Sequence, residues 1–533
     1  MLALTVAGVA AMAGSATGQV AAAGWTQYQG GATHPGAVAV GPGAPYAIDH
    51  ITTFDDLPGG SSESLGLSAP VVSGETAVMV GPTTVRVVSL GEGGVEWSVP
   101  REFGPSVPAA IDEGAQCARC HPIVVYTEGW GAGPGDPTAS ATPTTSVRPG
   151  ATSGSSSPSG SPASPTSSPS GTNDLSPSPS TSPQAPVSSD VMARNLIDGS
   201  KAWDAPVQLK ATSRTGVTLD GGTAFVGDIR GNVYAIDLGT GAIRWSVNVG
   251  GFLESPLAAS DGTLLISVNG YATDNAKLVA LDQTTGTVAW TYDTGHPGYL
   301  TSPAAADGRI FLGVTSFGTT GSVPSLVSVQ PPALADRGQE AKGIAAWESH
   351  LSAPVTFATA PSVAGGQVFV EDTFGDVFAV DRTSGNRNWM FATNTKFAQG
   401  GSLVVGEQVL VPTDNGTLIV LDASSGHQVF ESADAGGPLR YPAPVGTDRV
   451  IFTRGGPKPG LATFITDPSG AALTDIASPT TASYGRIVGN FAIAAAGLVL
   501  LSLLVFRPLA KRMGPAFFIE GDEAAEIGTE ENA

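Results

Sequence analysis

Aromatic residues, nearly always Trp, return at one position of a repeated unit along most of the chain, and no other feature constrains the fold as strongly. The clear copies place Ala or Val, Asp and Gly at fixed distances before the aromatic residue, in residues 235–245, 280–290, 379–389 and 420–430. Six of the eight Trp residues occupy this position, and random placement of a rare residue would not produce that. With weaker copies included, the positions are Trp97, Trp203, Trp245, Trp290, Trp347, Trp389 and Phe430.

The repeat has the length of a small antiparallel sheet. From Trp203 to Phe430 successive positions are separated by about 42, 45, 57, 42 and 41 residues, which is typical of a four-stranded propeller blade. Within a unit, β-branched strands such as 367–370 and 375–380 alternate with Gly turns. A blade cannot bury both of its faces alone, so neighbouring blades must stack around an axis, with the indole rings between them.

These residues resemble the tryptophan-docking motif A-x-D-x-x-T-G-x-x-x-W of the quinoprotein, or PQQ-repeat, β-propellers. The resemblance covers roughly residues 25–470 apart from one insertion, and residues 25–36 are similar to the W-x-x-[FY]-x-G-x-x-x-H-x-G opening of the same family. It implies an all-β domain over residues 25–480 with four-stranded antiparallel blades. A WD40 propeller fits less well, since no Gly-His and Trp-Asp pairs recur.

The number of blades follows from the repeat positions. The seven repeat positions mark seven units. An eighth unit begins near Arg440 but lacks a strand with the repeated Trp. We expect the strand from Ala47 to Phe54 to complete that blade, because closing the ring removes an open sheet edge. The prediction is therefore eight blades, with seven as the alternative.

Two apolar segments flank the repeats. Residues 487–506 carry no charge and are long enough to span a bilayer as a helix, and Arg507, Lys511 and Arg512 follow directly. The segment 487–506 and these basic residues predict one transmembrane helix, with an acidic cytoplasmic tail over 507–533 and the propeller outside. A buried core helix is the alternative. Residues 1–23 resemble a signal peptide without its basic start, so they are interpreted as a signal peptide or an N-terminal anchor.

One stretch of the chain has a composition that cannot form a core. Residues 131–190 are rich in Ser, Pro, Thr and Gly and lack aromatic side chains. They interrupt the second blade after the strand 123–126. We predict a disordered surface insertion, with a glycosylated spacer as the alternative.

The two Cys residues, Cys117 and Cys120, precede His121 with the spacing of a haem c attachment motif. They lie within a presumed turn of a blade, and no separate cytochrome domain surrounds them. A disulfide between Cys117 and Cys120 in an oxidising compartment is therefore preferred over haem, zinc or free thiols.

Charge and the remaining motifs limit the function classes. A formal charge of −21 disfavours binding to nucleic acid. The resemblance implies PQQ and Ca²⁺ for the enzymes of the family, yet the Cys-Cys pair that they use is absent from this sequence. The acidic residues that could line a funnel are interpreted as solvated loop carboxylates, not as metal ligands: Asp228, Glu254, Glu371 and Asp372.

Three functions remain for this sequence. The first is a non-enzymatic, membrane-tethered scaffold without a cofactor that binds protein partners in the cell envelope. The second is an oxidoreductase that uses PQQ with calcium. The third is a sensor of a small ligand or polysaccharide, which the short and featureless tail after residue 506 makes the weakest of the three.

Overall fold

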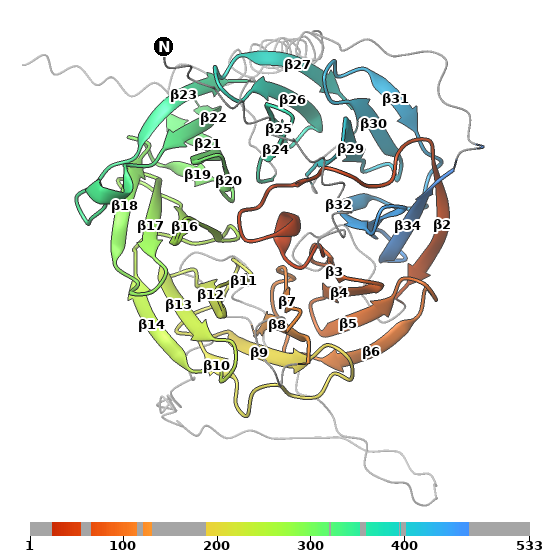
Figure 1. The fold of residues 1–533 in the computed structure, drawn as a ribbon, viewed down its shortest axis with the longest axis horizontal. Coiled ribbons are helices and arrows are strands. Elements are labelled where there is room, and N and C mark those ends of the chain that lie inside the picture. Colours follow the sequence, from red (N-terminus) through yellow and green to blue (C-terminus); the bar gives the residue numbers. More distant parts are fainter. Residues whose placement is uncertain are drawn as a thin grey trace, which may run out of the picture.

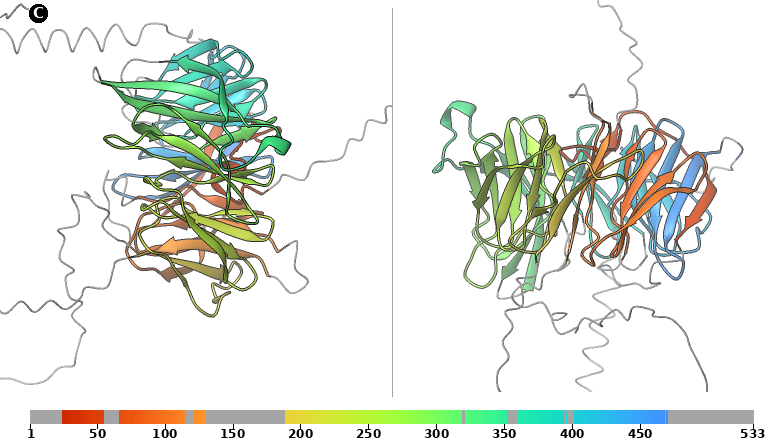
Figure 2. Two further views of the ribbon diagram at one scale, coloured as in Figure 1. Left: turned by 90° about the vertical axis from the view of Figure 1, so that its left-hand side faces the viewer. Right: turned by 90° about the horizontal axis from the view of Figure 1, so that it is seen from below.

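The protein is a ring of eight sheets around one axis, each with four antiparallel strands (Figure 1). The computed structural model describes residues 24–54, 66–114, 121–129, 188–318, 321–351, 359–393, 395, 401–467 and 469. Each sheet is built on four strands, so the predicted eight-bladed propeller is confirmed over the seven-bladed alternative. Figure 2 shows the ring from its sides as a disc of stacked blades.

Several predictions concern residues outside these ranges. They are the N-terminal segment 1–23, the helix 487–506, the tail 507–533, the pair Cys117 and Cys120, and most of the insertion. Among the residues that the structure describes, no helix is long and apolar enough to cross a membrane. Asp190, the last residue of the predicted insertion, is the first residue of a strand.

The blades follow one another in chain order, each running from the strand nearest the axis to the outermost strand. Blades 1 to 4 contain β3 (Val71–Ser73), β4 (Thr76–Val80), β5 (Thr84–Ser89) and β6 (Val95–Pro100); β7 (Ala110–Asp112), β8 (Ile123–Glu128), β9 (Asp190–Asn195) and β10 (Val207–Gln208); β11 (Thr218–Asp220), β12 (Thr223–Gly227), β13 (Asn232–Asp237) and β14 (Ile243–Asn248); and β15 (Ala258–Ser260), β16 (Thr263–Val268), β17 (Lys277–Asp282) and β18 (Val288–Asp293).

The second half of the ring uses the same order with additions. Blades 5 to 7 contain β20 (Ala304–Ala306), β21 (Arg309–Gly318), β22 (Gly321–Gln330) and β23 (Ile344–His350), joined by β19 (Gly298–Leu300); β24 (Ser362–Ala364), β25 (Gln367–Glu371), β26 (Asp376–Asp381) and β27 (Arg387–Ala392); and β28 (Leu403–Val405), β29 (Gln408–Pro412), β30 (Leu418–Asp422) and β31 (Gln428–Glu431), joined by β1 (Ala37–Val38). Blade 8 contains β32 (Leu439–Val445), β33 (Arg449–Arg454), β34 (Gly460–Thr466) and the N-terminal β2 (Tyr46–Thr53).

This order gives the disc two different faces. The loops between the second and third strands, and those that lead to the next blade, lie together on one face, which we call the funnel face. The turns between the first and second strands, and those before the outermost strand, lie on the opposite face, which we call the turn face. The repeated Asp and Gly residues belong to the turn face. There Asp381 accepts hydrogen bonds from the backbone N–H and the hydroxyl of Ser384, which hold the pKa of Asp381 below its usual range.

The repeated indoles lie between neighbouring blades. In β14, Trp245 Nε1 donates a hydrogen bond to the carbonyl of Gln283 in blade 4, at 2.9 Å. The ring covers Gly286, whose φ is +72° and whose missing Cβ would lie 2.7 Å from the indole. Both requirements explain why the turn carries Gly. The same arrangement joins Trp97 to Leu196 and Gly199, Trp203 to Leu238 and Gly241, Trp347 to Arg382 and Gly385, and Trp389 to Ala423 and Gly426.

A β-bulge accompanies these positions. In blade 4, Trp290 pairs with Ala280, and the register shifts by one residue directly after this pair. The same shift occurs beside Trp97, Trp245, Trp347, Trp389 and Phe430. A bulge increases local twist and changes where a side chain points, and the recurring shift gives these six blades the same outer-strand geometry at the docking residue.

Two positions depart from the common arrangement. Trp290 covers Gly343, but blade 5 has residues 331–343, with the short helix η3 (Leu334–Asp336), in place of the repeated turn. Among the described residues, Trp290 Nε1 has no hydrogen-bond partner. Phe430 faces blade 8, where the chain is interrupted between β34 and β2, and its ring lies 6.2 Å from that of Tyr46. Within the described ranges, β34 and β2 are not joined by a continuous turn that could accept a hydrogen bond from an indole.

The ring closes without a tryptophan. As predicted, an N-terminal strand completes blade 8, since β2 pairs with β34 along its length. On the turn of blade 1, His50 takes the place of the indole, because a Cβ on Gly93 would lie 2.9 Å from its ring. Arg449 donates to the carbonyl of Leu90 at 3.2 Å and forms an ion pair with Glu75 at 2.6 Å. A charged contact therefore replaces the indole N–H at this seam.

The N-terminal segment 25–38, which contains η1 (Tyr28–Gly30), crosses the centre of the ring, where it is drawn in red in Figure 1. It accepts a hydrogen bond from the middle residue of nearly every innermost strand in turn. These donors are the backbone N–H groups of Val72, Ile111, Ala259, Ala305, Val363 and Val404. In blade 3 the side chain of Gln27 binds both the N–H and the carbonyl of Leu219. The segment thus covers inner edges that would otherwise be unpaired.

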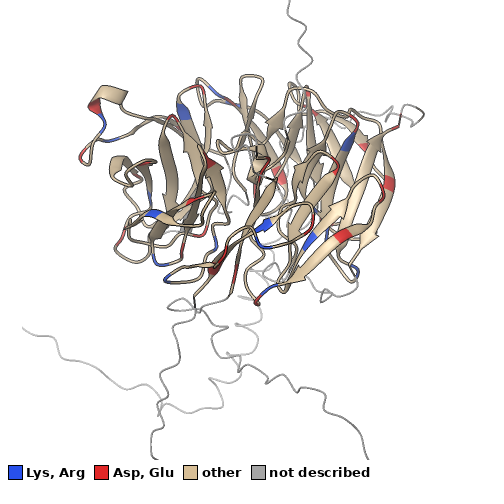
Figure 3. Cartoon of the chain, turned by 60° about the horizontal axis from the view of Figure 1, so that its bottom comes forward, with Lys and Arg blue, Asp and Glu red and all other residues tan. Residues whose placement is uncertain are grey.

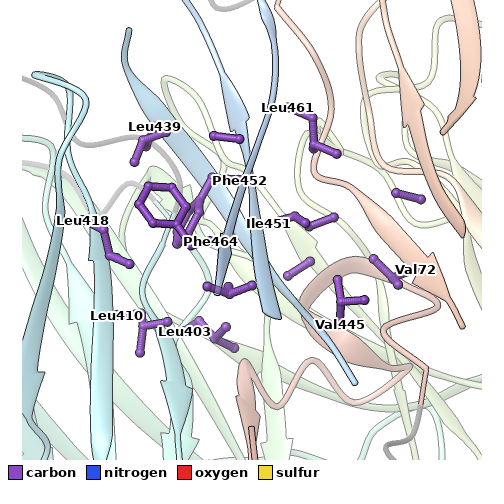
Figure 4. Packing of buried hydrophobic residues seen from close by; sticks show 14 of the residues in the cluster. Val72, Leu403, Leu410, Leu418, Leu439, Val445, Ile451, Phe452, Leu461 and Phe464 are labelled. Carbon is purple, nitrogen blue, oxygen red and sulfur yellow. The ribbon is translucent and has the colours of Figure 1, made fainter. Parts of the chain in front are cut away.

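The hydrophobic core is divided among the contacts between blades. One cluster extends from blade 7 through blade 8 to Val72 of blade 1 and includes Phe452 and Phe464, whose rings meet edge to face at 5.3 Å (Figure 4). Both sides of the closing blade are therefore packed. The other clusters each join two neighbouring blades.

The two kinds of indole contact lead to a prediction. Trp203→Phe removes a hydrogen bond to Leu238, whereas Trp290→Phe removes a buried N–H that has no partner among the described residues. Both indoles are almost fully buried, so the loss of ring volume is matched. We expect Trp203→Phe to lower the free energy of unfolding by about 1 kcal/mol more than Trp290→Phe. Denaturant unfolding of both variants measures this difference, and equal losses would contradict the prediction.

Candidate functional site: the central funnel

A large hollow of the described structure lies on the axis at the funnel face. Its volume is about 500 Å³, and Tyr28 of the axial segment lines it. Its wall comes mainly from residues just before the innermost strands of blades 1 to 6, namely Ala69, Pro108, Arg214, Ser255, Ser302 and Ala360, and from Tyr441 within β32 of blade 8. The axial segment that completes the inner strands therefore also lines this hollow.

A polar network occupies one side of the funnel. Arg214 donates to Glu254 Oε1 at 3.2 Å, and the second oxygen of Glu254 accepts from Asn269 at 3.1 Å and from Tyr271 at 3.3 Å. Burial raises the pKa of the Tyr271 hydroxyl above its usual range, and a hydrogen bond with Tyr299 and the charge of Glu254 raise it further. The phenol therefore stays neutral and serves as a donor. Glu254 is the one predicted acidic residue that lines this funnel.

A row of aromatic rings leads from this network toward the rim. Phe252, Tyr271, Tyr299 and Phe317 meet edge to face, with centroids 4.8, 5.4 and 4.9 Å apart. Tyr299 and Phe317 are 38% and 37% exposed. Rings in this geometry attract each other through their quadrupoles, which holds the row in place. The other exposed aromatic side chains of the described residues, Phe103 and Phe374, also lie in loops of the funnel face.

A buried histidine lies next to the floor. His34 Nδ1 contacts the carbonyl of Pro303 at 3.2 Å and the hydroxyl of Ser302 at 2.9 Å, and its ring meets Tyr28 edge to face. Burial lowers the pKa of His34 to about 4. The imidazole is therefore neutral at physiological pH, and it holds the axial segment against blade 5.

Three of the four predicted acidic residues are buried, so their interpretation as solvated carboxylates is wrong. Asp228 organises the loop after β12, where its carboxylate accepts hydrogen bonds from Arg230, Asn232 and Tyr234. Asp372 holds the corresponding loop of blade 6, and burial, followed by the charge of Asp376, raises its pKa to about 7. These carboxylates stabilise loops that the repeat pattern alone does not show to be buried.

Glu371 is the most unusual of the buried acids. It is fully buried, and neither of its carboxyl oxygens has a hydrogen-bond partner among the described residues. Burial, followed by the charge of Asp372, raises the pKa of Glu371 to about 8. The folded protein therefore keeps this carboxyl protonated at neutral pH.

The described residues offer little for a metal ion. No three His, Cys, Asp or Glu side chains within the described ranges are grouped so that they could hold one. His121 lies within those ranges, whereas Cys117 and Cys120 do not. The sequence reasoning missed the Arg214–Glu254 network and the aromatic row. These residues occupy loops, the added strand β19 and the extended end of β21, which differ from blade to blade, so no repeated signal marks them.

Glu371 gives a prediction for the pH dependence of stability. Its pKa is about 8 in the folded protein against 4.5 for the free group, so unfolding releases a proton between these pH values. Its contribution to the free energy of unfolding should fall by up to about 5 kcal/mol as the pH rises through this window. We expect Glu371→Gln to raise the melting temperature at pH 8 but not near pH 4. Thermal unfolding across this range measures the effect. The control is Glu96→Gln, a change at an exposed residue; an unchanged pH profile in Glu371→Gln would contradict the assignment.

Comparison with known proteins agrees with the repeats. A family profile described as "Outer membrane protein assembly factor BamB" matches residues 187–325 and 337–456. The curated BamB of Yersinia pestis is 26% identical over 236 residues, which cover 41% of this chain and 53% of the relative. The serine/threonine-protein kinase AfsK of Streptomyces griseus is 29% identical over 181 residues, 33% of this chain and 21% of the relative. The chain thus spans about half or less of the length of these relatives.

Among solved structures, the quinohemoprotein alcohol dehydrogenase ADHIIG of Pseudomonas putida HK5 has a similar fold. It has a TM-score of 0.51 and 11% identity, with 86% of this chain and 82% of that chain covered. At such an identity the likeness concerns the fold alone. The profile match and the eight-bladed fold agree with the docking motifs: over residues 187–325 and 337–456 the chain carries repeats of the PQQ-repeat, quinoprotein-like family of β-propellers.

Proposed function

We propose that this protein is a non-enzymatic interaction module of the cell envelope, which binds protein partners through its funnel face. The predicted helix 487–506 tethers it to the membrane, and the propeller lies outside the cytoplasm. One observation carries this proposal: the exposed aromatic side chains of the described residues all lie on the funnel face. Aromatic residues are enriched in protein interfaces, where they supply much of the binding energy.

The relatives support an interaction role. BamB is named as an assembly factor of outer membrane proteins, and we transfer to this chain only the general role of a protein-binding propeller. Figure 3 shows acidic and basic residues scattered over the ring, without a continuous basic surface. With a formal charge of −21, this distribution favours a protein partner over nucleic acid.

The path of the chain supports the choice of face. The first described residue, Gly24, lies beside Glu113 in a turn-face loop of blade 2. The last strand, β34, also ends on the turn face, where Asp467 donates its N–H to Pro45. A tether that continues from this point leaves the funnel face directed away from the membrane. The aromatic row then stays open to partners.

The second candidate is an oxidoreductase that uses PQQ with calcium. Such enzymes occur in the family, and the central funnel is the place where a cofactor would bind. The described residues of the funnel fit this cofactor pair poorly. Glu254 is the funnel's acidic side chain, and the guanidinium of Arg214 already pairs with it at 3.2 Å. Calcium sites use six to eight oxygen ligands, several of them carboxylates. We therefore derive no reaction step through PQQ.

Site-specific crosslinking tests the interaction proposal. A photo-crosslinking amino acid at Tyr299 or Phe317, in full-length protein within its native cells, should capture the same envelope protein from both positions. The control position is Leu334 on η3, which is 76% exposed but lies on the turn side of blade 5. Mass spectrometry identifies the partner, and Tyr299→Ala with Phe317→Ala should reduce its recovery with the purified propeller severalfold. Capture of partners from Leu334 alone would overturn the choice of face.

Cofactor titration tests the second candidate. Purified full-length protein is mixed with PQQ and CaCl₂, and bound PQQ is measured by absorbance after gel filtration. We expect no stoichiometric uptake and no oxidation of alcohols or sugars with an artificial electron acceptor. Stoichiometric uptake with turnover would replace the scaffold proposal with the enzyme.

A further inference from the structure

A second cavity lies off the axis, between blades 4 and 5. Its volume is about 400 Å³, and its lining is largely different from that of the funnel. The side chains that matter for its chemistry are Tyr292, His296, Phe317, Ser325, Glu348 and His350. We call it the blade 4–5 pocket. It opens at the funnel face, and Phe317 belongs both to this pocket and to the aromatic row.

The sequence of blade 5 explains why a cavity exists at this place. The hairpin strands β21 and β22 have ten residues each, whereas the corresponding strands β16 and β17 of blade 4 have six. The longer hairpin extends past the end of blade 4 at the funnel face. Because β16 and β17 are each four residues shorter, they do not match the full length of the blade 5 hairpin, and the cavity lies at this end of the two blades.

Strand alternation decides which side chains enter the pocket. In β18, Tyr292 is two residues after Trp290 and points to the same side, toward blade 5. In β23, Glu348 and His350 point away from Trp347, which packs against blade 6, and therefore toward blade 4. Both strands thus present polar and aromatic groups to the same space.

The pocket carries negative charge. Glu348 Oε1 accepts a hydrogen bond from the hydroxyl of Ser325 at 2.6 Å, and Glu348 Oε2 accepts none from the described residues. Among the described lining residues there is no Lys or Arg. Burial, then the charges of Glu348 and Asp293, raise the pKa of the Tyr292 hydroxyl. This second carboxylate oxygen of Glu348, which has no donor among the described residues, belongs to a side chain that lines the same pocket as the rings of Tyr292 and Phe317.

We propose that the blade 4–5 pocket binds an arginine side chain of the partner polypeptide. A planar guanidinium can donate hydrogen bonds to a carboxylate while its face stacks on an aromatic ring, and it is more weakly hydrated than an ammonium group. The pocket supplies these two elements, Glu348 and the neighbouring rings. The proposal rests on the proposed function, because it names the chemistry by which the funnel face selects its partner.

Other ligands fit the pocket less well. An anion would meet the unneutralised charge of Glu348. His296, His350 and Glu348 are ligand types for zinc, but no group of three such side chains within the described ranges is placed to hold a metal ion. An apolar side chain would bury the free oxygen of Glu348 without a hydrogen bond.

The test uses small probes of matched shape and purified full-length protein. Saturation-transfer difference spectroscopy measures the affinity for N-acetylarginine amide and for N-acetylcitrulline amide, in which the guanidinium is replaced by a neutral urea group. We expect arginine to bind at least tenfold more tightly than citrulline. Glu348→Gln, which keeps the side-chain shape, should abolish this preference, and Tyr292→Phe should keep it.

The matched control is Glu113→Gln. Glu113 also accepts a hydrogen bond from a serine hydroxyl, that of Ser73 at 2.8 Å, but it lies on the turn face. The variant Glu113→Gln should leave the preference for arginine over citrulline unchanged. Equal binding of arginine and citrulline, or an unchanged preference in Glu348→Gln, would overturn the pocket assignment. A zinc titration is the third measurement. If zinc binds tightly and Glu348→Gln abolishes this binding, the ligand of the pocket is a metal ion and not an arginine side chain. None of these results depends on the crosslinks at Tyr299, so the two proposals fail separately.

Discussion

The contact between an indole and the turn of the next blade is the interaction on which this structure depends. A blade buries its faces only against neighbours, so each interface needs a contact that sets spacing and orientation together. The indole provides both, because its ring needs a glycine to rest on and its N–H needs a carbonyl at one distance. Where the partner turn is missing, the contact changes accordingly: Phe430 needs no acceptor, and Trp290 keeps the ring contact with Gly343 but has no acceptor among the described residues.

Ring closure poses a different problem, which the N-terminal segment solves. It covers the inner edges along the axis and then supplies β2 as the last strand of blade 8. At the seam, His50 lies over Gly93 and Arg449 binds Leu90, so the position of an indole is shared by two side chains. Because the same segment contributes Tyr28 to the funnel lining, closure of the ring and the shape of the candidate site are coupled.

The sequence predicted the parts of the fold that repeat. Each blade solves the same packing problem with the same residues, so positions such as Trp245 and Gly286 stand out, and the repeat also indicated that an N-terminal strand was needed for closure. The sequence indicated Glu254 as a possible funnel residue but did not predict its polar network or the aromatic row. Arg214 lies in the loop before β11 and Tyr299 lies in the added strand β19, and neither position repeats from blade to blade. Burial was also misjudged: Asp228 and Glu371 look alike in the sequence, yet one accepts several hydrogen bonds and the other accepts none from the described residues.

Blade 5 departs most from the repeat, and its departures are connected. Its outer turn is replaced by residues 331–343, its hairpin is longer than those of the neighbouring blades, and an added strand, β19, supports that hairpin. The extension creates the uncovered surface beside blade 4, and β19 carries Tyr299 of the aromatic row. A repeated scaffold can tolerate such changes in one blade because the indole contacts on either side, at Trp290 and Trp347, are retained. Specific recognition can therefore evolve in one blade without disturbing the packing that holds the ring together.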